Sequence, residues 1–431
     1  MMIFKRFRVR NLVDDNIYYP VGDGDHGSIK PEMYQENGIP YIRVQNLNWN
    51  GQISLKGMVF ISDDVNNANS KSILKPNDIL IAKTGATIGK LGLITDEIGI
   101  ANTTSSVGKV TVDSSRFSPK YILYCFQSKN FNDQLWLEAS QKSAQPGFNI
   151  DNLVDFEIFA PERLADQVSI AEYLDKKTTE IDTIIAKKEQ LLELLEEKKK
   201  AIINEVVTKG LNPNTTMKNS GIEWIGEIPE HWEIVQLKYL TIKVGSGVTP
   251  KGGAEVYSDD GIKFIRSQNV YFEGLRLADV VFIDEKIHNQ MENSKVNLND
   301  VLLNITGGSI GRSCIVNIES EFNVNQHVCI IRPNEKLLPE FLNFALFSNL
   351  GQTQIRLGIT GGNREGLNFE NIKNFYIPNI SIKEQEEIVG YLNIKNDELN
   401  LISTKISTQI SKLKEYRQSL ISEAVTGKID I

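Results

Sequence analysis

The nonapeptide GIPYIRVQN at residues 38–46 occurs again, slightly altered, as GIKFIRSQN at residues 261–269. Six further blocks repeat in the same order, and the offset between copies slides only from 223 to 218 residues. They are NDIL (77–80) with NDVL (299–302), TGATIGK (84–90) with TGGSIGR (306–312), PKY (119–121) with PEF (339–341), GFN (147–149) with GLN (366–368), Gln167 to Leu174 with Gln385 to Leu392, and EVVT (205–208) with EAVT (423–426). Chance does not keep seven blocks in order with so few gaps, so the chain is an internal duplication.

Each copy begins with a strand-rich part and ends with a long helix. Segments such as 79–82 and 329–331 are short, apolar and bounded by Gly, Asn or Pro, which is typical of strands. The TGATIGK segment lacks the spacing and the Ser or Thr of a phosphate-binding loop, so we expect a turn between two strands there. Asp23 to Gly27 hints at a calcium loop, but ligand positions are missing, and a polar loop is the better interpretation.

The two predicted helices carry heptad seams, in which apolar residues alternate at spacings of three and four. Ser381 with Glu384 indicates a capping box, and Gly210 and Gly427 stand where C-caps belong. A helix of about 45 residues would span roughly 65 Å. The predicted seam residues are Leu174, Ile181, Ile184, Leu191, Leu195 and Ile202 in the first copy and Leu392, Leu399, Ile402, Leu413 and Leu420 in the second. The predicted polar interruptions are Lys177, Lys188 and Lys198, then Lys395, Gln409 and Tyr416.

Two matched helices can bury their seams against each other, most simply as an antiparallel coiled coil with a pseudo-twofold between the copies. The alternative is that each helix covers its own domain. We therefore predict an α+β chain with two mixed, strand-rich domains alternating with two long helices. The predicted segments are a domain at 1–161, a helix at 162–210, a domain at 211–380 with a lead-in linker at 211–231, and a helix at 381–431.

Composition excludes several classes of protein. The net charge is −8, so any affinity for nucleic acid must come from local patches or from a partner. Three cysteines without a CxxC pair favour buried, reduced thiols. The four histidines are scattered and indicate no metal cluster. Since neither a membrane span nor a secretory signal is evident, we expect a cytoplasmic protein.

Catalytic motifs are also missing from both copies. The sequence has no GxSxG, no HExxH, no strand-linked GxGxxG, and no Asp/Asn-Pro-Pro-aromatic motif of the kind that holds a flipped adenine. Enzyme duplication usually leaves at least one recognisable site, so we expect a non-catalytic chain. A nuclease or methyltransferase with an unfamiliar site remains an alternative.

Over nearly its whole length, the chain resembles the specificity subunits of type I restriction–modification systems. The resemblance rests on GIPYIR (38–43) and GIKFIR (261–266), on TGATIG (84–89), on IPEHW (228–232), and on IKEQEEI (382–388) followed by Tyr391 and Leu392. One departure is at the front, where the first domain has no counterpart of the Pro-Glu-His-Trp entry. That departure leaves the opening strand of the first domain undetermined.

The resemblance implies two target-recognition domains, each reading one half of a bipartite double-stranded DNA site, with the helices fixing the gap. It further implies partners that dock on the helices. Modification subunits, expected to be two, would methylate adenine with S-adenosylmethionine. A restriction subunit would cleave with ATP and Mg, and this chain would hold no cofactor or metal. The alternative function is a non-catalytic scaffold that presents two ligand-binding domains.

Base edges are read by polar and cationic side chains on loops, so the most polar, glycine-bearing loops hold our candidates. Those of the first domain are Ser28, Lys30, Lys83, Thr84, Thr104, Ser105, Lys142 and Gln145, and those of the second are Ser246, Thr249, Lys251, Asn325, Gln326, Asn363 and Arg364. Arg43 and Arg266 occur in both copies, so we expect a structural or phosphate role for them. Arg364→Ala is expected to weaken specific binding at the second half-site only.

Overall fold

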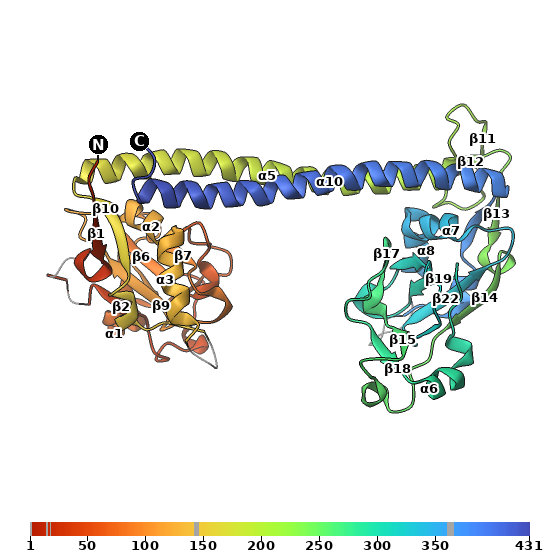
Figure 1. The fold of residues 1–431 in the computed structure, drawn as a ribbon, viewed down its shortest axis with the longest axis horizontal. Helices are drawn as coiled ribbons and strands as arrows, with labels where there is room; N and C mark the ends of the chain where they lie inside the picture. Colours follow the sequence, from red (N-terminus) through yellow and green to blue (C-terminus); the bar gives the residue numbers. More distant parts are fainter. Residues whose placement is uncertain (1, 14–15, 18, 142–145, 360–365) are drawn as a thin grey trace. The chain divides into compact units, whose positions relative to one another are not determined.

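The computed structural model describes residues 1–431 except 1, 14–15, 18, 142–145 and 360–365. The chain forms two compact units, of which unit 1 is Met1–Glu189 with Ser407–Ile431 and unit 2 is Gln190–Ile406. Each unit combines a strand-rich body with one segment of each long helix (Figure 1). The predicted α+β class is therefore confirmed. The four predicted segments stay a prediction, because the compact units group the chain differently and take one end of both helices.

Unit 1 contains two four-stranded sheets, ordered β2-β9-β6-β7 and β4-β3-β8-β5, and an antiparallel pair of β1 with β10. The strands are β1 (Phe4–Arg8), β2 (Val21–Asp23), β3 (Ile39–Ile42), β4 (Val59–Ile61), β5 (Ile73–Leu74), β6 (Asp78–Ala82), β7 (Leu91–Leu93), β8 (Ala101–Thr103), β9 (Val107–Thr111) and β10 (Glu157–Pro161). The short helices are α1 (Asp63–Ala68), α2 (Pro119–Gln127), α3 (Lys129–Ala139) and α4 (Ile150–Leu153).

Unit 2 repeats this plan with the sheets β14-β22-β19-β20 and β18-β15-β21 and the pair β13 with β23. It adds the hairpins β11–β12 and β16–β17. The strands are β11 (Met217–Asn219), β12 (Glu227–Pro229), β13 (Glu233–Gln236), β14 (Thr241–Ser246), β15 (Ile262–Ile265), β16 (Val270–Tyr271), β17 (Gly274–Leu275), β18 (Val281–Ile283), β19 (Val301–Asn304), β20 (Ser313–Ile315), β21 (Phe322–Val324), β22 (Val328–Pro333) and β23 (Tyr376–Asn379). The short helices are α6 (Glu285–Gln290), α7 (Pro339–Phe347), α8 (Asn349–Gly358) and α9 (Phe369–Lys373).

The strand pairing confirms the duplication and resolves the opening strand. β6 contains the predicted strand segment 79–82, and β22 contains the predicted segment 329–331. The TGATIGK segment is the expected turn, since it connects the antiparallel strands β6 and β7. At the front, β1 pairs with β10 as β13 pairs with β23. The first domain thus has the opening strand without the Pro-Glu-His-Trp entry.

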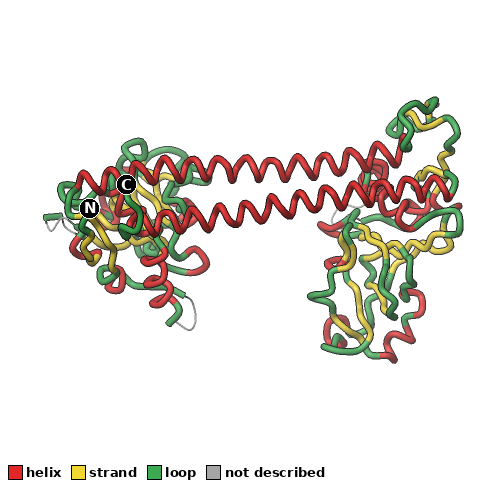
Figure 2. Tube along the Cα trace, turned by 45° about the horizontal axis from the view of Figure 1, so that its top comes forward, coloured by secondary structure: helices red, strands yellow, loops and turns green. Residues whose placement is uncertain are grey.

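The long helices are α5 (Leu164–Lys209) and α10 (Ile382–Val425), and within each unit one segment of α5 packs against one segment of α10 (Figures 1 and 2). In unit 1, Arg417 Nε lies 2.9 Å from Asp182 Oδ1 and Lys414 Nζ lies 3.3 Å from Glu189 Oε1. Residue numbers rise along one helix as they fall along the other, so the pair is antiparallel. In unit 2, Ile203 shares a buried cluster with Ile388.

The predicted seam was partly wrong in register. Ile184, Leu191 and Ile402 are 44%, 43% and 43% exposed, whereas the neighbouring Ile185 is 8% exposed. Because two apolar residues are adjacent at 184–185 and at 191–192, the pattern alone could not choose between them. One predicted polar interruption of the seam is also displaced by one residue. Tyr416 was expected to face inward but is exposed, whereas the neighbouring Arg417 is half-buried. The inward heptad positions of α5 are Leu174, Thr178, Ile181, Ile185, Lys188, Leu192, Leu195 and Lys199.

The helix ends are mostly as expected. Gly210 and Gly427 have φ angles of 74° and 71° and close the two helices. Ser381 Oγ accepts from the backbone N–H of Glu384 at 3.2 Å, as in a capping box. The Glu384 carboxylate, however, accepts from Trp232 Nε1 at 2.9 Å and lies beside His231. It therefore anchors the start of unit 2's body to α10, which is a tertiary role that the local pattern did not reveal.

All three cysteines are free and buried, as expected. Burial raises the pKa of the Cys314 and Cys329 thiols to about 12. Among the described residues, no helix combines the length and apolarity that a bilayer crossing requires.

Candidate nucleic-acid interface

In unit 1 the candidate loops meet at one end of the β2-β9-β6-β7 sheet. β2 ends at Asp23, β6 ends at Ala82, and the antiparallel β9 between them begins at Val107. Backbone hydrogen bonds join the loops, with Ser105 N–H donating to Asp25 O at 2.8 Å and Lys83 N–H to Ser106 O at 2.9 Å. We call residues 23–30, 83–90 and 104–106 loop cluster 1.

Unit 2 builds the same arrangement from β14, β22 and β19, and we call residues 246–251, 305–312 and 325–327 loop cluster 2. Gly247 N–H donates to Val328 O at 3.1 Å and Ile305 N–H to His327 O at 3.0 Å. Glycine is required at one matched place in each cluster. A Cβ atom at Gly24 would lie 2.2 Å from Thr103 O, and one at Gly247 would lie 1.8 Å from Val324 O.

Asp25 organises the first loop of cluster 1. Its carboxylate accepts hydrogen bonds from the backbone N–H groups of Gly27, Ser28 and Ile29, at 2.9 to 3.0 Å. Burial alone would raise the pKa of Asp25, but these hydrogen bonds outweigh burial and lower it. The loop thus presents Ser28 and Lys30, both exposed, on a fixed backbone.

Lys83 is less available than its sequence context suggested. It is 7% exposed, and its ammonium group forms an ion pair with Asp23. Thr84, Thr104 and Ser105 are half-buried beside it. Thr84 also pairs with Gly147, which brings the chain that follows residues 142–145 to this cluster. Lys142 and Gln145 themselves lie outside the described residues.

In cluster 2, Lys251 and Gln326 are exposed and Ser246 and Thr249 are half-buried. Asn325 is 8% exposed, and its Oδ1 accepts from the backbone N–H of His327 at 3.1 Å. Thr306 pairs with Gly366 as Thr84 pairs with Gly147. Asn363 and Arg364 lie outside the described residues.

The two clusters share a backbone frame but differ in chemistry. Strand register matches Asp23 with Ser246, and Lys83 with Ile305. The ion pair of cluster 1 is therefore replaced by a hydroxyl and an apolar side chain in cluster 2. Cluster 2 also contains a side-chain hydrogen bond between Thr306 Oγ1 and His327 Nδ1.

Comparison with known proteins decides the family. The profile of the type I restriction modification DNA specificity domain matches residues 26–194 and again residues 229–412. This chain belongs to that family.

Several curated relatives of this specificity-domain protein are type I specificity subunits. The specificity subunit of the Escherichia coli enzyme EcoBI is 29% identical over 62% of this chain and 57% of that subunit. The specificity subunit of MjaVIII from Methanocaldococcus jannaschii is 27% identical over 84% of this chain and 81% of its own length. The specificity subunit of EcoKI from Escherichia coli strain K12 is 21% identical over 92% of this chain and 83% of its own length.

Solved structures share the fold. One chain from a study of assembly and conformational transition in the type I R-M system superposes with a TM-score of 0.73 at 13% identity, over 98% of this chain and 97% of that chain. The HsdS subunit of Thermoanaerobacter tengcongensis gives a TM-score of 0.52 at 15% identity, over 99% and 97%.

The structure also places three cationic side chains near the loop clusters that were not among the candidates predicted from the sequence. Lys90 and Arg312 end the two turns and directly precede β7 and β20, at the same sheet ends as the loop clusters. Lys90 Nζ lies 6.0 Å from the centre of the Trp49 ring. In unit 2 the guanidinium carbons of Arg276 and Arg312 lie 3.5 and 4.9 Å from the Tyr271 ring centre. Aromatic neighbours next to these cations are the signal that could have identified them.

Arg43 and Arg266, for which we expect a structural or phosphate role, make matched intramolecular contacts in the two units. Arg43 Nη2 donates to Gly57 O at 2.8 Å, and Arg266 Nη2 donates to Asp279 O at 2.9 Å. Each guanidinium also lies over a tyrosine ring, at 5.6 and 6.0 Å. Both side chains thereby tie a strand to the loop that follows it.

Proposed function

We propose that this chain is the DNA sequence-specificity subunit of a type I restriction–modification complex, with loop clusters 1 and 2 each reading one half of a bipartite site. The observation that carries the proposal is the shared frame with different polar chemistry. Two half-sites of different sequence need different side chains on equivalent backbones. Lys90, Arg276 and Arg312 would contact phosphates beside them, which suits an acidic chain whose positive charge is local.

The chemistry would belong to partner subunits. Modification subunits, two in number, would methylate adenine with S-adenosylmethionine, and an ATP- and Mg-dependent restriction subunit would cleave; the complex would act in the cytoplasm. The helix pair would set the gap between half-sites and dock the modification subunits. Apolar residues exposed on the helices in unit 2 support such docking, and they are Leu191, Leu194, Ile394, Leu401 and Ile402.

The experiment is a map of adenine methylation in the host genome with the intact chain, without it, and with one cluster altered at a time. The cluster 1 variant is Ser28→Ala with Lys30→Ala, and the cluster 2 variant is Lys251→Ala with Gln326→Ala. Deletion should abolish one bipartite methylated motif, and each variant should relax only one half of it. An intact motif after deletion, or equal relaxation of both halves by either variant, would overturn the proposal. The purified chain alone should neither methylate nor cleave DNA.

A further inference from the structure

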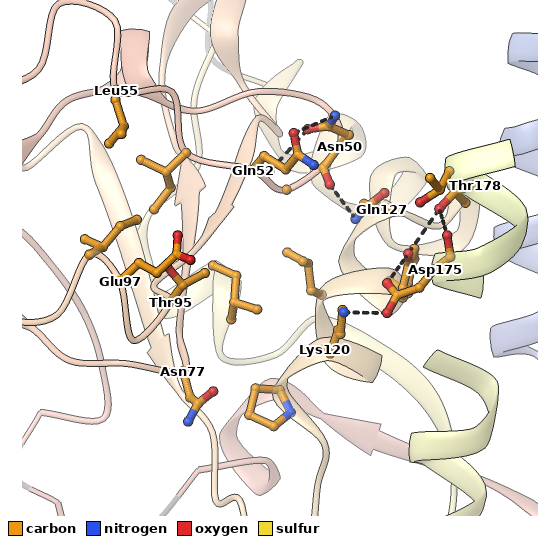
Figure 3. Close-up of a pocket in the computed structure, with 18 of the residues that line it drawn as sticks. Asn50, Gln52, Leu55, Asn77, Thr95, Glu97, Lys120, Gln127, Asp175 and Thr178 are labelled. Atoms are coloured by element: carbon orange, nitrogen blue, oxygen red, sulfur yellow. Dashed lines mark hydrogen bonds and ion pairs between the residues drawn. The ribbon is translucent and has the colours of Figure 1, made fainter. Parts of the chain in front are cut away.

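Unit 1 contains a groove of about 1060 Å³ between its strand-rich body and its helices (Figure 3). Ile53, Leu55 and Met58 contribute an apolar wall, and the opposite wall carries Asp175 and Thr178 of α5. Asp175 is paired with Lys120, and Asp182 with Arg417. Because these two carboxylates are already paired with cations, the helix wall of the groove favours an uncharged guest; the third lining carboxylate, Glu97, lies on the other wall beside Thr95 (Figure 3).

Unit 2 fills the matched place with its own aromatic ring. Phe272 stacks on Phe347 of α7 with ring centres 3.9 Å apart, and it meets Phe344 edge-on at 5.7 Å. Lys199 of α5, which is 3% exposed, lies 5.6 Å from the Phe272 ring centre and 3.9 Å from a Glu273 carboxylate oxygen. In unit 2 the space between the loop that carries Phe272 and the helix α5 is therefore filled by the Phe272 ring and the Lys199 side chain.

In unit 1 the corresponding ring is turned away. The sequence Asn48-Trp49-Asn50-Gly51 matches Tyr271 to Gly274, which places Trp49 at the position of Phe272. Matched hydrogen bonds from Asn46 Nδ2 to Ser54 O and from Asn269 Nδ2 to Arg276 O frame the two loops, and the loop of unit 1 is one residue longer. Trp49 is 58% exposed, so its ring does not fill the groove.

The partner of that ring has changed as well. Gln127 of α2 occupies the place of Phe347, and it lines the groove while being only 5% exposed. Its Nε2 donates to Asn50 O at 3.4 Å (Figure 3), but its Oε1 has no hydrogen-bond partner among the residues that the structure describes. A buried acceptor without a donor is costly, so a guest that turns the Gln127 amide toward the groove and gives Oε1 an N–H or O–H would be stabilised.

We propose that this groove of unit 1 is a docking site for a partner polypeptide that inserts one aromatic side chain carrying an N–H donor, that is, a tryptophan. The ring would occupy the place that Phe272 fills in unit 2, beneath Arg417 as Phe272 lies beneath Lys199. Its indole N–H would donate to Gln127 Oε1. The groove is larger than one ring. Leu55, which lines it and is 71% exposed, offers apolar surface for the partner residues on either side of the inserted tryptophan.

The test uses the full chain with ¹³C-methyl-labelled methionine, because the methyl group of Met58 reports on the groove. The probes are N-acetyltryptophanamide, indole, and indene, which has the shape of indole without its N–H. We expect saturable shifts of the Met58 methyl signal with the first two probes and none at Met33 or Met217. Indene should bind about fivefold more weakly, which is the effect of one hydrogen bond.

Two variants make the test specific. Gln127→Leu removes the acceptor and should erase the difference between indole and indene. Gln127→Phe introduces the residue of unit 2 and should block all three probes, whereas Phe272→Ala in unit 2 should leave the Met58 shifts unchanged. The proposal is overturned if Met58 does not respond, if Gln127→Leu keeps the preference for indole, or if indole binds while N-acetyltryptophanamide does not. Should Gln127→Phe not fold, the result with Gln127→Leu decides alone. None of these outcomes depends on DNA recognition.

Discussion

At the scale of single residues, the two copies show how one backbone carries two chemistries. The positions matched by strand register hold an ion pair in cluster 1 and the pair Ser246 and Ile305 in cluster 2. The loop that follows β2 is fixed by the Asp25 carboxylate, and no such acceptor stands at the matched Val248. Local rigidity is thus achieved differently while the strand frame stays the same.

Lys83→Ile should leave the Asp23 carboxylate without its cation and destabilise unit 1 by about 2 kcal/mol, less than for a fully buried pair because Asp23 is partly exposed. The double variant Asp23→Ser with Lys83→Ile reproduces the residues of unit 2 and should recover stability to within about 1 kcal/mol. Urea unfolding measures both. A double variant no more stable than the single one would contradict the ion-pair explanation.

Arg43→Met should lower stability by about 1 to 2 kcal/mol, because its bond to Gly57 O and its contact with Tyr34 are lost. The methylated motif of the complex should keep its sequence. Arg266→Met is the matched variant in unit 2 and should behave alike. A changed base preference in either variant would show that these arginines read DNA.

At the scale of elements, the helices depend on which of two neighbouring apolar residues faces inward. Ile185 is buried and Ile184 is exposed, although the sequence offers both to the seam. The start of α10 shows a second tertiary choice. The Glu384 side chain, which a capping box would direct to the helix's own first turn, instead accepts from the fully buried Trp232.

Ile185→Ala should destabilise the helix pair by about 2 to 3 kcal/mol, because it removes buried methyl groups and leaves a cavity. Ile184→Ala, one residue away on the same helix, should change stability by less than about 0.5 kcal/mol. Thermal unfolding of the two variants side by side is the measurement. Equal losses would mean that the seam has the register first predicted from the sequence.

At the scale of the whole molecule, charge limits how the chain can hold DNA alone. The net charge is −8, so the overall field of the chain repels the phosphate backbone. Each phosphate contact contributes roughly 0.9 to the slope of log K against log salt concentration. Most of the phosphate contacts of the complex would therefore come from partner subunits.

The salt dependence of DNA binding should accordingly be shallow for the chain alone and steeper, by several units of slope, for its complex with modification subunits. Fluorescence anisotropy with a duplex that carries the methylated motif, at a series of salt concentrations, measures both slopes. The complex bound to a duplex of scrambled sequence is the control. Equal slopes for chain and complex would show that this chain supplies the phosphate contacts itself.

The sequence by itself determined the duplication, the α+β class, the long helices with their glycine C-caps, and the strands at 79–82 and 329–331. These features are periodic or local, so composition and spacing express them directly. The sequence also placed most candidate residues on loops that the fold brings to one end of a sheet in each unit. Only the tertiary structure decided that Lys83 forms an ion pair with Asp23 and that Ile185 rather than Ile184 faces inward. It also decided that Glu384 accepts a hydrogen bond from Trp232, and that unit 1 keeps an open groove at the place that Phe272 fills in unit 2. Each of these features depends on contacts between residues far apart in the chain, and local sequence patterns do not encode such contacts.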